Sequence, residues 1–363
     1  MTLRLPRRTL LQGTAAATLL AAAGRPALAD SPLKVGFVYV GPVGDFGWTY
    51  RHDVGRRAVE DHFGDRVETT FVESVSEGPD AERVIRQLAA SGHELIFTTS
   101  FGFGSSTLRV ARQFADVKFE HATGYQRADN VATYAGRFHE GRAVVGTLAG
   151  MLTQSNRIGY IASFPIPEVI RGINATAIHA RKVNPEAQVV PIWVNTWYDP
   201  GREAEAAAAL ISQGVDVMTQ HTDSPAPVQA AAERGVPAVG QASDMRRFAP
   251  EHQITALIDT WGPYYIRRVQ AVLDGTWTST DTWEGFADGM VQLAEYGPMV
   301  TPEMAAAADA VRTSIVDGTY DPFQGPIMAQ DGSVMFEDGH VPSDDEIRGM
   351  NRYVEGVVGS IPG

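Results

Sequence analysis

Short hydrophobic runs alternate with amphipathic stretches along the chain after residue 30, at spacings typical of βαβ units. Val35–Val40 is almost continuously apolar, as expected of a parallel strand buried on both faces. The strands predicted after it are Val67–Val72, Leu95–Thr99, Val117–His121 and Val131–Ala135. Helices are predicted between these strands at residues 80–90 and 107–115. This first series therefore predicts one parallel α/β sheet.

A second series with the same rhythm begins at Arg157–Ala162. Its further strands are Val189–Val194, Val215–Gln220 and Ala238–Gly240, and its helices are residues 168–182, 202–213 and 225–234. Two such series predict two doubly wound α/β lobes. The helix predicted at Glu140–Leu152 would carry the chain from the first lobe to the second. The tail after Gly325 is rich in Gly, Pro and Asp, which predicts loops, short strands and a final helix.

The N-terminus carries the pattern of an export signal. Arg7 and Arg8 precede an apolar stretch, Leu10–Ala23, and Ala27-Leu28-Ala29 supplies the small-x-small pattern that signal peptidase recognises. We predict a signal peptide of the twin-arginine type over residues 1–29, cleaved before Asp30. A membrane anchor would use the same apolar residues, but the stretch is short for a span. The Sec export route stays open.

Composition narrows the possible partners. The chain has 363 residues and no cysteine, so it has neither a disulfide framework nor a cysteine for lipid attachment. Its formal net charge of −13 becomes −17 once the four arginines of the signal are removed. An acidic surface argues against nucleic acid and anionic membranes as partners. A protein of the periplasm without a membrane anchor is therefore expected.

Aromatic and polar residues follow the predicted strands, where open α/β sheets collect their ligands. These segments are residues 41–50, 100–106, 163–168, 195–199, 220–223 and 243–244. Aromatic faces stack on flat rings, and carboxylates and amides recognise ring N–H groups by hydrogen bonding. Together the segments predict a cleft that binds a planar, nitrogen-rich heterocycle.

Each of these residues also has a structural interpretation. Trp48 and Trp197 could pack in the core or between the lobes. Glu168 follows Pro167 at a predicted helix start, where a carboxylate favours the helix dipole without any ligand. Asp199 is equally suited to a turn and helix cap, and His221 to a buried, hydrogen-bonded histidine.

Motifs typical of enzymes are missing. The sequence has no G-x-G-x-x-G after a strand, no P-loop, no G-x-S-x-G and no His/Glu cluster with metal-ligand spacing. We therefore predict no catalytic residue, no metal and no cofactor. Several acids near the cleft leave a periplasmic nucleoside hydrolase open as an alternative.

Several ordered motifs resemble those of the basic membrane protein family, the purine nucleoside receptor type of ABC transporter substrate-binding proteins. The segments that carry the resemblance are residues 45–50, 96–102, 119–124, 192–200 and 240–245. The likeness covers roughly residues 32–328. It implies a type I periplasmic binding fold with three crossovers between the lobes.

The resemblance also implies how the chain is divided. The first lobe would comprise residues 30–138 and 255–288, and the second residues 139–254 and 289–330. Residues 331–363 would form a tail that packs on the lobes. On this division Ile254–Asp259 and the helix Tyr264–Leu273 return to the first lobe, whereas Met290–Leu293 and Pro302–Val316 belong to the second.

The resemblance implies that the purine stacks between aromatic residues, and the matching positions in this sequence are Trp48, Phe101 and Trp197. Two positions depart from the family pattern: Ala242 replaces an acid, and Asp259 ends the segment in which nucleoside receptors tend to have a lysine. The full set of candidate ligand-binding residues is Asp45, Trp48, Thr49, Ser100, Phe101, Glu168, Asn195, Trp197, Asp223, Asp244 and Asp259.

Loss of the lysine and of one acid removes groups that recognise ribose hydroxyls. A free purine base exposes an N9–H donor, which a nearby acid such as Asp259 can accept. The expected function is that of a periplasmic receptor for a free purine such as adenine or guanine, working with an ABC permease in the inner membrane. The fold is typical of monomers. A sensory receptor that binds the same ligand for a chemoreceptor is an alternative.

Overall fold

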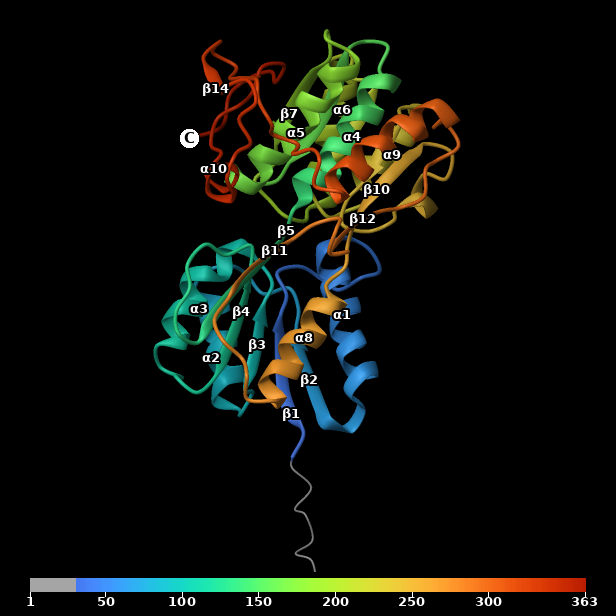
Figure 1. The fold of residues 1–363 in the computed structure, drawn as a ribbon. Helices are drawn as coiled ribbons and strands as arrows, with labels where there is room; N and C mark the ends of the chain where they lie inside the picture. Colours follow the sequence, from blue (N-terminus) through green and yellow to red (C-terminus); the bar gives the residue numbers. More distant parts are fainter. Residues whose placement is uncertain (1–30) are drawn as a thin grey trace, which may run out of the picture. The chain divides into compact units, whose positions relative to one another are not determined.

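The computed structural model describes residues 31–363, so the predicted export signal at residues 1–29 lies outside the described residues. None of the described helices is long and apolar enough to cross a membrane. The described chain contains two six-stranded sheets, each flanked by helices (Figure 1).

The first lobe is built on the sheet of order β11-β5-β4-β3-β1-β2, in which every neighbouring pair is parallel. Its strands are β1 (Leu33–Val38), β2 (Val67–Val72), β3 (Leu95–Thr98), β4 (Lys118–Ala122), β5 (Val131–Gly136) and β11 (Asp281–Glu284). Its helices are α1 (Gly47–Phe63), α2 (Pro79–Ala90), α3 (Gly104–Ala111) and α8 (Gly262–Leu273), which packs against α1 (Figure 1).

The second lobe repeats this topology with the order β12-β10-β9-β8-β6-β7. Its strands are β6 (Arg157–Ala162), β7 (Gln188–Trp193), β8 (Val217–Gln220), β9 (Ala238–Gly240), β10 (Gln253–Asp259) and β12 (Val291–Leu293), which alone is antiparallel to its neighbour. Its helices are α4 (Phe138–Leu152), α5 (Pro167–Val183), α6 (Pro200–Ser212), α7 (Ala226–Ala232) and α9 (Pro302–Val316). Two doubly wound α/β lobes, as the sequence predicted, are therefore present.

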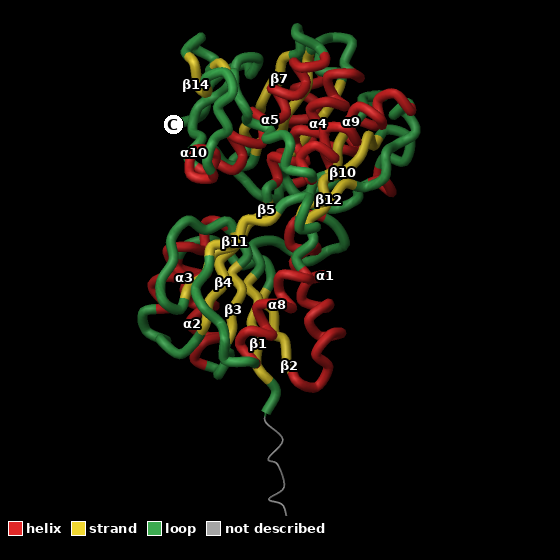
Figure 2. Tube along the Cα trace, viewed as in Figure 1, coloured by secondary structure: helices red, strands yellow, loops and turns green. Residues whose placement is uncertain are grey.

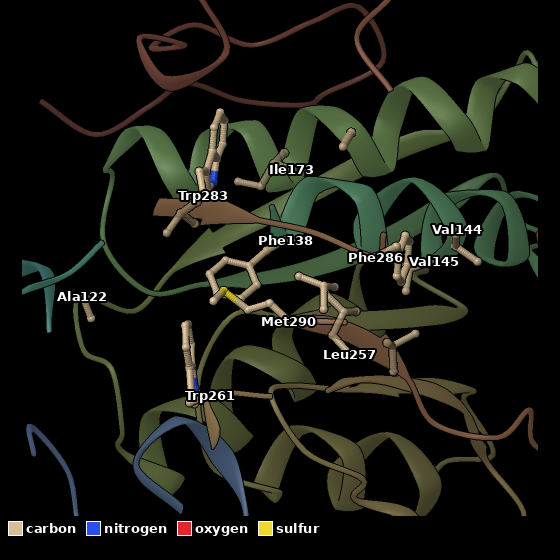
Figure 3. Packing of buried hydrophobic residues seen from close by; sticks show 14 of the residues in the cluster. Ala122, Phe138, Val144, Val145, Ile173, Leu257, Trp261, Trp283, Phe286 and Met290 are labelled. Atoms are coloured by element: carbon tan, nitrogen blue, oxygen red, sulfur yellow. The ribbon is translucent and has the colours of Figure 1, made fainter. Parts of the chain in front are cut away.

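The chain passes between the lobes three times: after β5, after β10 and after β11 (Figure 2). These passages carry large hydrophobic side chains, namely Phe138, Trp261 and Met290, all of them buried. Phe138 and Trp261 pack edge to face with ring centroids 6.2 Å apart. One hydrophobic cluster consequently continues from one lobe to the other (Figure 3).

The tail contains β13 (Ile327–Met328), β14 (Val334–Phe336) and a short helix, α10 (Asp344–Arg348). A complete capping box starts this helix, because Ser343 and Glu346 exchange side-chain-to-backbone hydrogen bonds. Two ion pairs hold α10: Asp344 pairs with Arg137, in the passage after β5, and Arg348 pairs with Asp281, at the start of β11.

One expectation needs correction, and one helix was not predicted. The strand at Ile254–Asp259 does not return to the first lobe: β10 pairs with β9 in the second sheet, and the chain crosses only after Asp259. Helix α1, which the hydrophobic pattern did not predict, fills the interval between β1 and β2. Its inner face is polar, since His52, Asp53 and Arg56 are buried there and Arg56 Nε donates to Asp53 Oδ1 at 2.7 Å.

Candidate functional site

A cavity lies between the two lobes, at the carboxyl ends of their strands. In both sheets the order reverses after the first strand of the lobe, between β1 and β3 and between β6 and β8. Loops that leave such switch points diverge and open a crevice for ligands. The cavity, of about 370 Å³, is lined by Val40, Trp48, Ser100, Phe101, Thr123, Glu168, Trp197, His221, Asp223 and Gln241. We call it the interlobe cavity.

Trp48, at the start of α1, provides a rigid aromatic wall on the first-lobe side. Its indole Nε1 donates to the Thr99 carbonyl at 2.6 Å. Behind it, the rings of His52 and Trp261 meet its ring edge to face at 4.4 and 5.3 Å. Because the indole is fixed by one hydrogen bond and two aromatic contacts, it is oriented before any ligand arrives.

Two further aromatic residues line the cavity. Trp197 belongs to the second lobe and packs against Phe164 with ring centroids 4.8 Å apart. Phe101, after β3, stacks on Tyr125 at 6.0 Å with an interplanar angle of 29°. The interlobe cavity therefore has aromatic surfaces from both lobes, an arrangement suited to a flat ligand.

Glu168 and His221 form a polar wall in the second lobe. Glu168 Oε1 lies 3.4 Å from His221 Nε2, and His221 Nδ1 lies 3.0 Å from Ser163 Oγ. The other carboxylate oxygen of Glu168, Oε2, is buried and has no hydrogen-bond partner among the described residues. A buried acceptor without a partner is costly, so a ligand donor placed there would be favoured.

Asp223, after β8, is the second acid of the cavity. Burial raises the pKa of its carboxyl well above the usual range, and the nearby Glu203 and Asp259 raise it further. The Trp48 amide opposes this shift in pKa by donating to Asp223 Oδ1 at 3.2 Å. That hydrogen bond links the lobes, since Trp48 belongs to the first and Asp223 to the second.

Other hydrogen bonds and an ion pair connect the lobes around the interlobe cavity. The Gly47 amide donates to Ser243 Oγ at 2.7 Å, and Trp197 Nε1 donates to Glu77 Oε1 at 3.0 Å. The further contacts are Arg51 Nε with the Asp259 carbonyl at 2.6 Å and the ion pair between Asp45 and Arg247. The rims of the two lobes are thus in contact in this structure.

Six of the eleven candidate residues line the interlobe cavity: Trp48, Ser100, Phe101, Glu168, Trp197 and Asp223. Thr49 and Asn195 line neighbouring hollows instead. Thr49 Oγ1 accepts a hydrogen bond from the Gly41 amide at 3.3 Å, which supports the turn after β1.

The acids Asp45, Asp244 and Asp259 do not line the interlobe cavity. Asp45 is exposed, and its pairing with Arg247 holds its pKa below the usual value. Asp244 accepts from the Arg246 amide and from Gln253 Nε2, at 2.9 and 2.7 Å, and so stabilises the loop after β9. Asp259 is 1% exposed, and neither carboxylate oxygen has a hydrogen-bond partner among the described residues.

Four lining residues were absent from the candidate set: Val40, Thr123, His221 and Gln241. All of them follow a strand within two residues. The expectation that ligand-binding residues follow strands therefore also applies to Thr123, His221 and Gln241, whereas Val40 was placed inside the first predicted strand. Gln241 is held by Arg142, which donates to its Oε1 and to the Gln220 carbonyl. Within residues 31–363, no group of three or more His, Asp or Glu side chains is placed to hold a metal ion.

Two solved structures with this architecture are described as solute-binding proteins of ABC transporters. One from Aeropyrum pernix K1 matches with a TM-score of 0.67 and 18% identity, over 88% of this chain and 98% of that one. Another from Conexibacter woesei gives a TM-score of 0.64 at 22% identity, over 80% and 98% of the two chains. The fold is therefore the type I periplasmic binding fold expected from the resemblance.

Sequence comparison then defines the family. The profile of the Bmp family, described as PnrA-like ABC transporter substrate-binding proteins, matches residues 33–320. A purine-binding protein of Brucella abortus is 52% identical over 93% of this chain and 97% of its own length. A putative ABC transporter glucose-binding protein of Haloferax volcanii is 38% identical, over 91% and 81%. The chain belongs to the Bmp family of ABC transporter substrate-binding proteins, which function outside the cytoplasm.

Proposed function

We propose that this chain is the periplasmic receptor of an ABC importer for a purine, with the free base favoured over the nucleoside. The observation that carries the proposal is the interlobe cavity, with its aromatic surfaces from both lobes and its two acids, Glu168 and Asp223. The purine-binding relative at 52% identity supports the same ligand class.

Recognition would combine stacking with hydrogen bonds. The base would stack on Trp48, Phe101 or Trp197, and stacking contributes about 1–3 kcal/mol per base. The unpartnered Oε2 of Glu168 would accept a hydrogen bond from a ring N–H or an exocyclic amine. Purines offer such donors around a flat ring, so the polar and aromatic walls would act on one ligand.

The preference for a free base is supported by the groups that surround the cavity. No lysine lines the interlobe cavity, and Asp259 stands where nucleoside receptors of the family tend to have that side chain. A ribose needs partners for its hydroxyl groups, and burying them without partners is costly. A free base has no ribose, so it has no hydroxyl groups that need such partners.

Ligand binding would stabilise the closed arrangement of the lobes. Trp48 and Phe101 come from the first lobe, and Glu168 and Trp197 from the second, so a ligand contacting all four favours the state in which the rims meet. Closure would in turn create the surface that the permease recognises.

A hydrolase is the weaker candidate. Ser163, His221 and Glu168 are arranged in the order of a serine triad, with the histidine between the hydroxyl and the acid. The Ser163 hydroxyl, however, belongs to a residue with no exposed surface, and Ser163 does not line the interlobe cavity. A nucleophile must reach its substrate, so we propose that these residues orient the polar wall and that the protein is not an enzyme.

A thermal-shift panel tests the proposal. Residues 30–363, refolded to remove ligand, would be heated with adenine, guanine, hypoxanthine, xanthine, their nucleosides and glucose. Ligand at about a hundred times its dissociation constant adds roughly 2.7 kcal/mol of stability. A shift with bases alone supports the proposal, whereas a shift with nucleosides alone or with glucose alone would refute the free-base receptor.

Two further assays separate the alternatives. Chromatography of a nucleoside incubated with the protein should reveal no released base. Uptake of labelled purine should fall when the gene is deleted; unchanged uptake, together with tight binding, would favour a sensory role.

A further inference from the structure

A second and larger cavity adjoins the interlobe cavity. Its volume is about 1360 Å³, and the two cavities share Phe101, Thr123 and Glu168. The remaining wall carries charged and aromatic side chains, chiefly Tyr125, Arg127, Arg171, Trp283, Asp345 and Arg348. We call it the arginine cavity.

Arg171, on α5, is the unusual residue of the arginine cavity. It is only 7% exposed, yet its guanidinium forms no hydrogen bond or ion pair with any described residue. Burial lowers the pKa of Arg171 to about 10; Glu168 opposes this effect, while Arg348 and Arg137 add to it. A buried cation without a partner is costly, and it leaves N–H donors available to an incoming anion.

Trp283, on β11, holds three arginines close together. The guanidinium carbons of Arg137, Arg348 and Arg171 lie 4.3, 4.5 and 5.2 Å from the centre of its ring. Cation–π attraction compensates part of the repulsion among them. The indole therefore fixes a guanidinium cluster at the wall of the arginine cavity.

The neighbouring acids form ion pairs with some of these arginines but not with others. Arg348 pairs with Asp281, and Arg137 pairs with Asp344 at 2.7 Å. Of the other lining acids, Glu168 lies against His221 and Asp345 is exposed. Arg171 and the exposed Arg127 are left without an ion-pair partner among the described residues.

We propose that the arginine cavity binds an oxyanion of the phosphate type, with Arg171 as its principal ligand and Arg127 and Arg348 beside it. The planar guanidinium donates two parallel hydrogen bonds to such a group. Because the cavities share three residues, the phosphate can be carried by a purine ligand, as in a nucleoside monophosphate, or bind as free phosphate. Only the first source rests on the proposed function.

Calorimetric titration of ligand-free protein tests this site with three probes: inorganic phosphate, a purine base, and the corresponding purine 5′-monophosphate. Arg171→Met should weaken binding of the phosphate-bearing probe roughly 10- to 100-fold, because charge-assisted hydrogen bonds are lost. Affinity for the free base should stay within about threefold of wild type. Arg112→Met, which removes the exposed arginine directly after α3, is the matched control and should change neither affinity.

Asp281→Asn provides a test of opposite sign. It removes the carboxylate that pairs with Arg348, so affinity for the oxyanion should rise. A folding defect would not produce a gain, and this variant therefore keeps the inference testable if Arg171→Met fails to fold.

The three probes distinguish a phosphate group carried by a purine from a free phosphate ion. Tighter binding of the monophosphate than of the base shows a phosphate carried by the purine; binding of inorganic phosphate beside a bound base shows a separate ion. If neither phosphate-bearing probe binds, or if Arg171→Met binds them like wild type, the site is overturned. If the wild-type protein binds inorganic phosphate but neither the purine base nor the monophosphate, the result would contradict the proposed function and support the oxyanion site.

Discussion

Asp259 should make the protein less stable as the pH rises. Its carboxylate is buried and has no hydrogen-bond partner among the described residues, so the charged form is disfavoured in the folded state. Burial is the main cause and Glu168 adds to it; although Arg51 and Arg142 oppose them, the pKa of Asp259 rises from 3.8 to about 8. The folded protein therefore binds this proton more tightly than the unfolded chain does.

The sign and size of the effect follow from proton linkage. A raised carboxyl pKa costs nothing below the unfolded pKa, and the cost grows until the pH passes the folded pKa. The shift of roughly four pKa units corresponds to at most about 5–6 kcal/mol. Of this, about 3–4 kcal/mol should be lost between pH 5 and pH 8.

Urea unfolding of wild type and of Asp259→Asn at pH 5 and pH 8 measures this loss. The amide cannot ionise, so the variant should lose about 3–4 kcal/mol less than wild type over the same interval. Buried acids that do not interact with Asp259 act equally in both proteins and cancel in the comparison, whereas Asp223, whose pKa Asp259 helps to raise, does not cancel completely. Asp61→Asn, at an exposed position on α1, is the control and should behave like wild type. Equal pH dependence in wild type and Asp259→Asn would show that the folded protein does not hold a proton on Asp259.

Three further substitutions test the site and the fold. Trp48→Ala should weaken purine binding by about 1–3 kcal/mol in calorimetry, because a stacking surface is lost; unchanged affinity would remove Trp48 from the site. Trp197→Phe keeps a ring but loses the hydrogen bond to Glu77 between the lobes. The activation free energy for purine dissociation, measured by stopped flow, should therefore fall by about 0.5–1.5 kcal/mol. An unchanged dissociation rate would argue against this contact in the bound state. Glu120→Ala leaves the buried Arg268 without its ion-pair partner and should cost about 3–5 kcal/mol in unfolding free energy; a loss below 1 kcal/mol would contradict that role.

Most of the fold was predictable because most of its strands are short runs rich in β-branched and aromatic residues. The strands at Val67–Val72, Arg157–Ala162 and Ala238–Gly240 have the bounds that the sequence predicted. Helix α1 was missed for a physical reason: the face it buries carries ionic and hydrogen-bonded groups, and its N-cap residue, Phe46, gives no side-chain cap. The segment therefore lacks the clear hydrophobic periodicity from which a helix is predicted.

The lobe to which a strand belongs was less predictable than the strand itself. The run Ile254–Asp259 reads as a buried strand in either lobe, and only its pairing with β9 places it in the second sheet. Strand β11, at Asp281–Glu284, is short and largely polar, so it gave no signal of its own.

The position of a residue after a strand predicted its proximity to the cavity but not the direction of its side chain. Trp48, Phe101 and Trp197 reach the interlobe cavity from three such loops. Asp45 and Asp244 occupy similar loops, yet local partners hold them elsewhere, Arg247 in one case and Gln253 in the other. Such competition depends on contacts between segments distant in sequence.

Calorimetric titration of adenine and guanine into ligand-free protein, residues 30–363, tests directly whether the protein is a receptor for a purine base. At least one base should bind saturably to a single site, with a negative heat-capacity change from burial of the ring. The same base should bind its Trp48→Ala variant more weakly. Absence of binding by any purine base, with saturable binding of glucose instead, would contradict the claim.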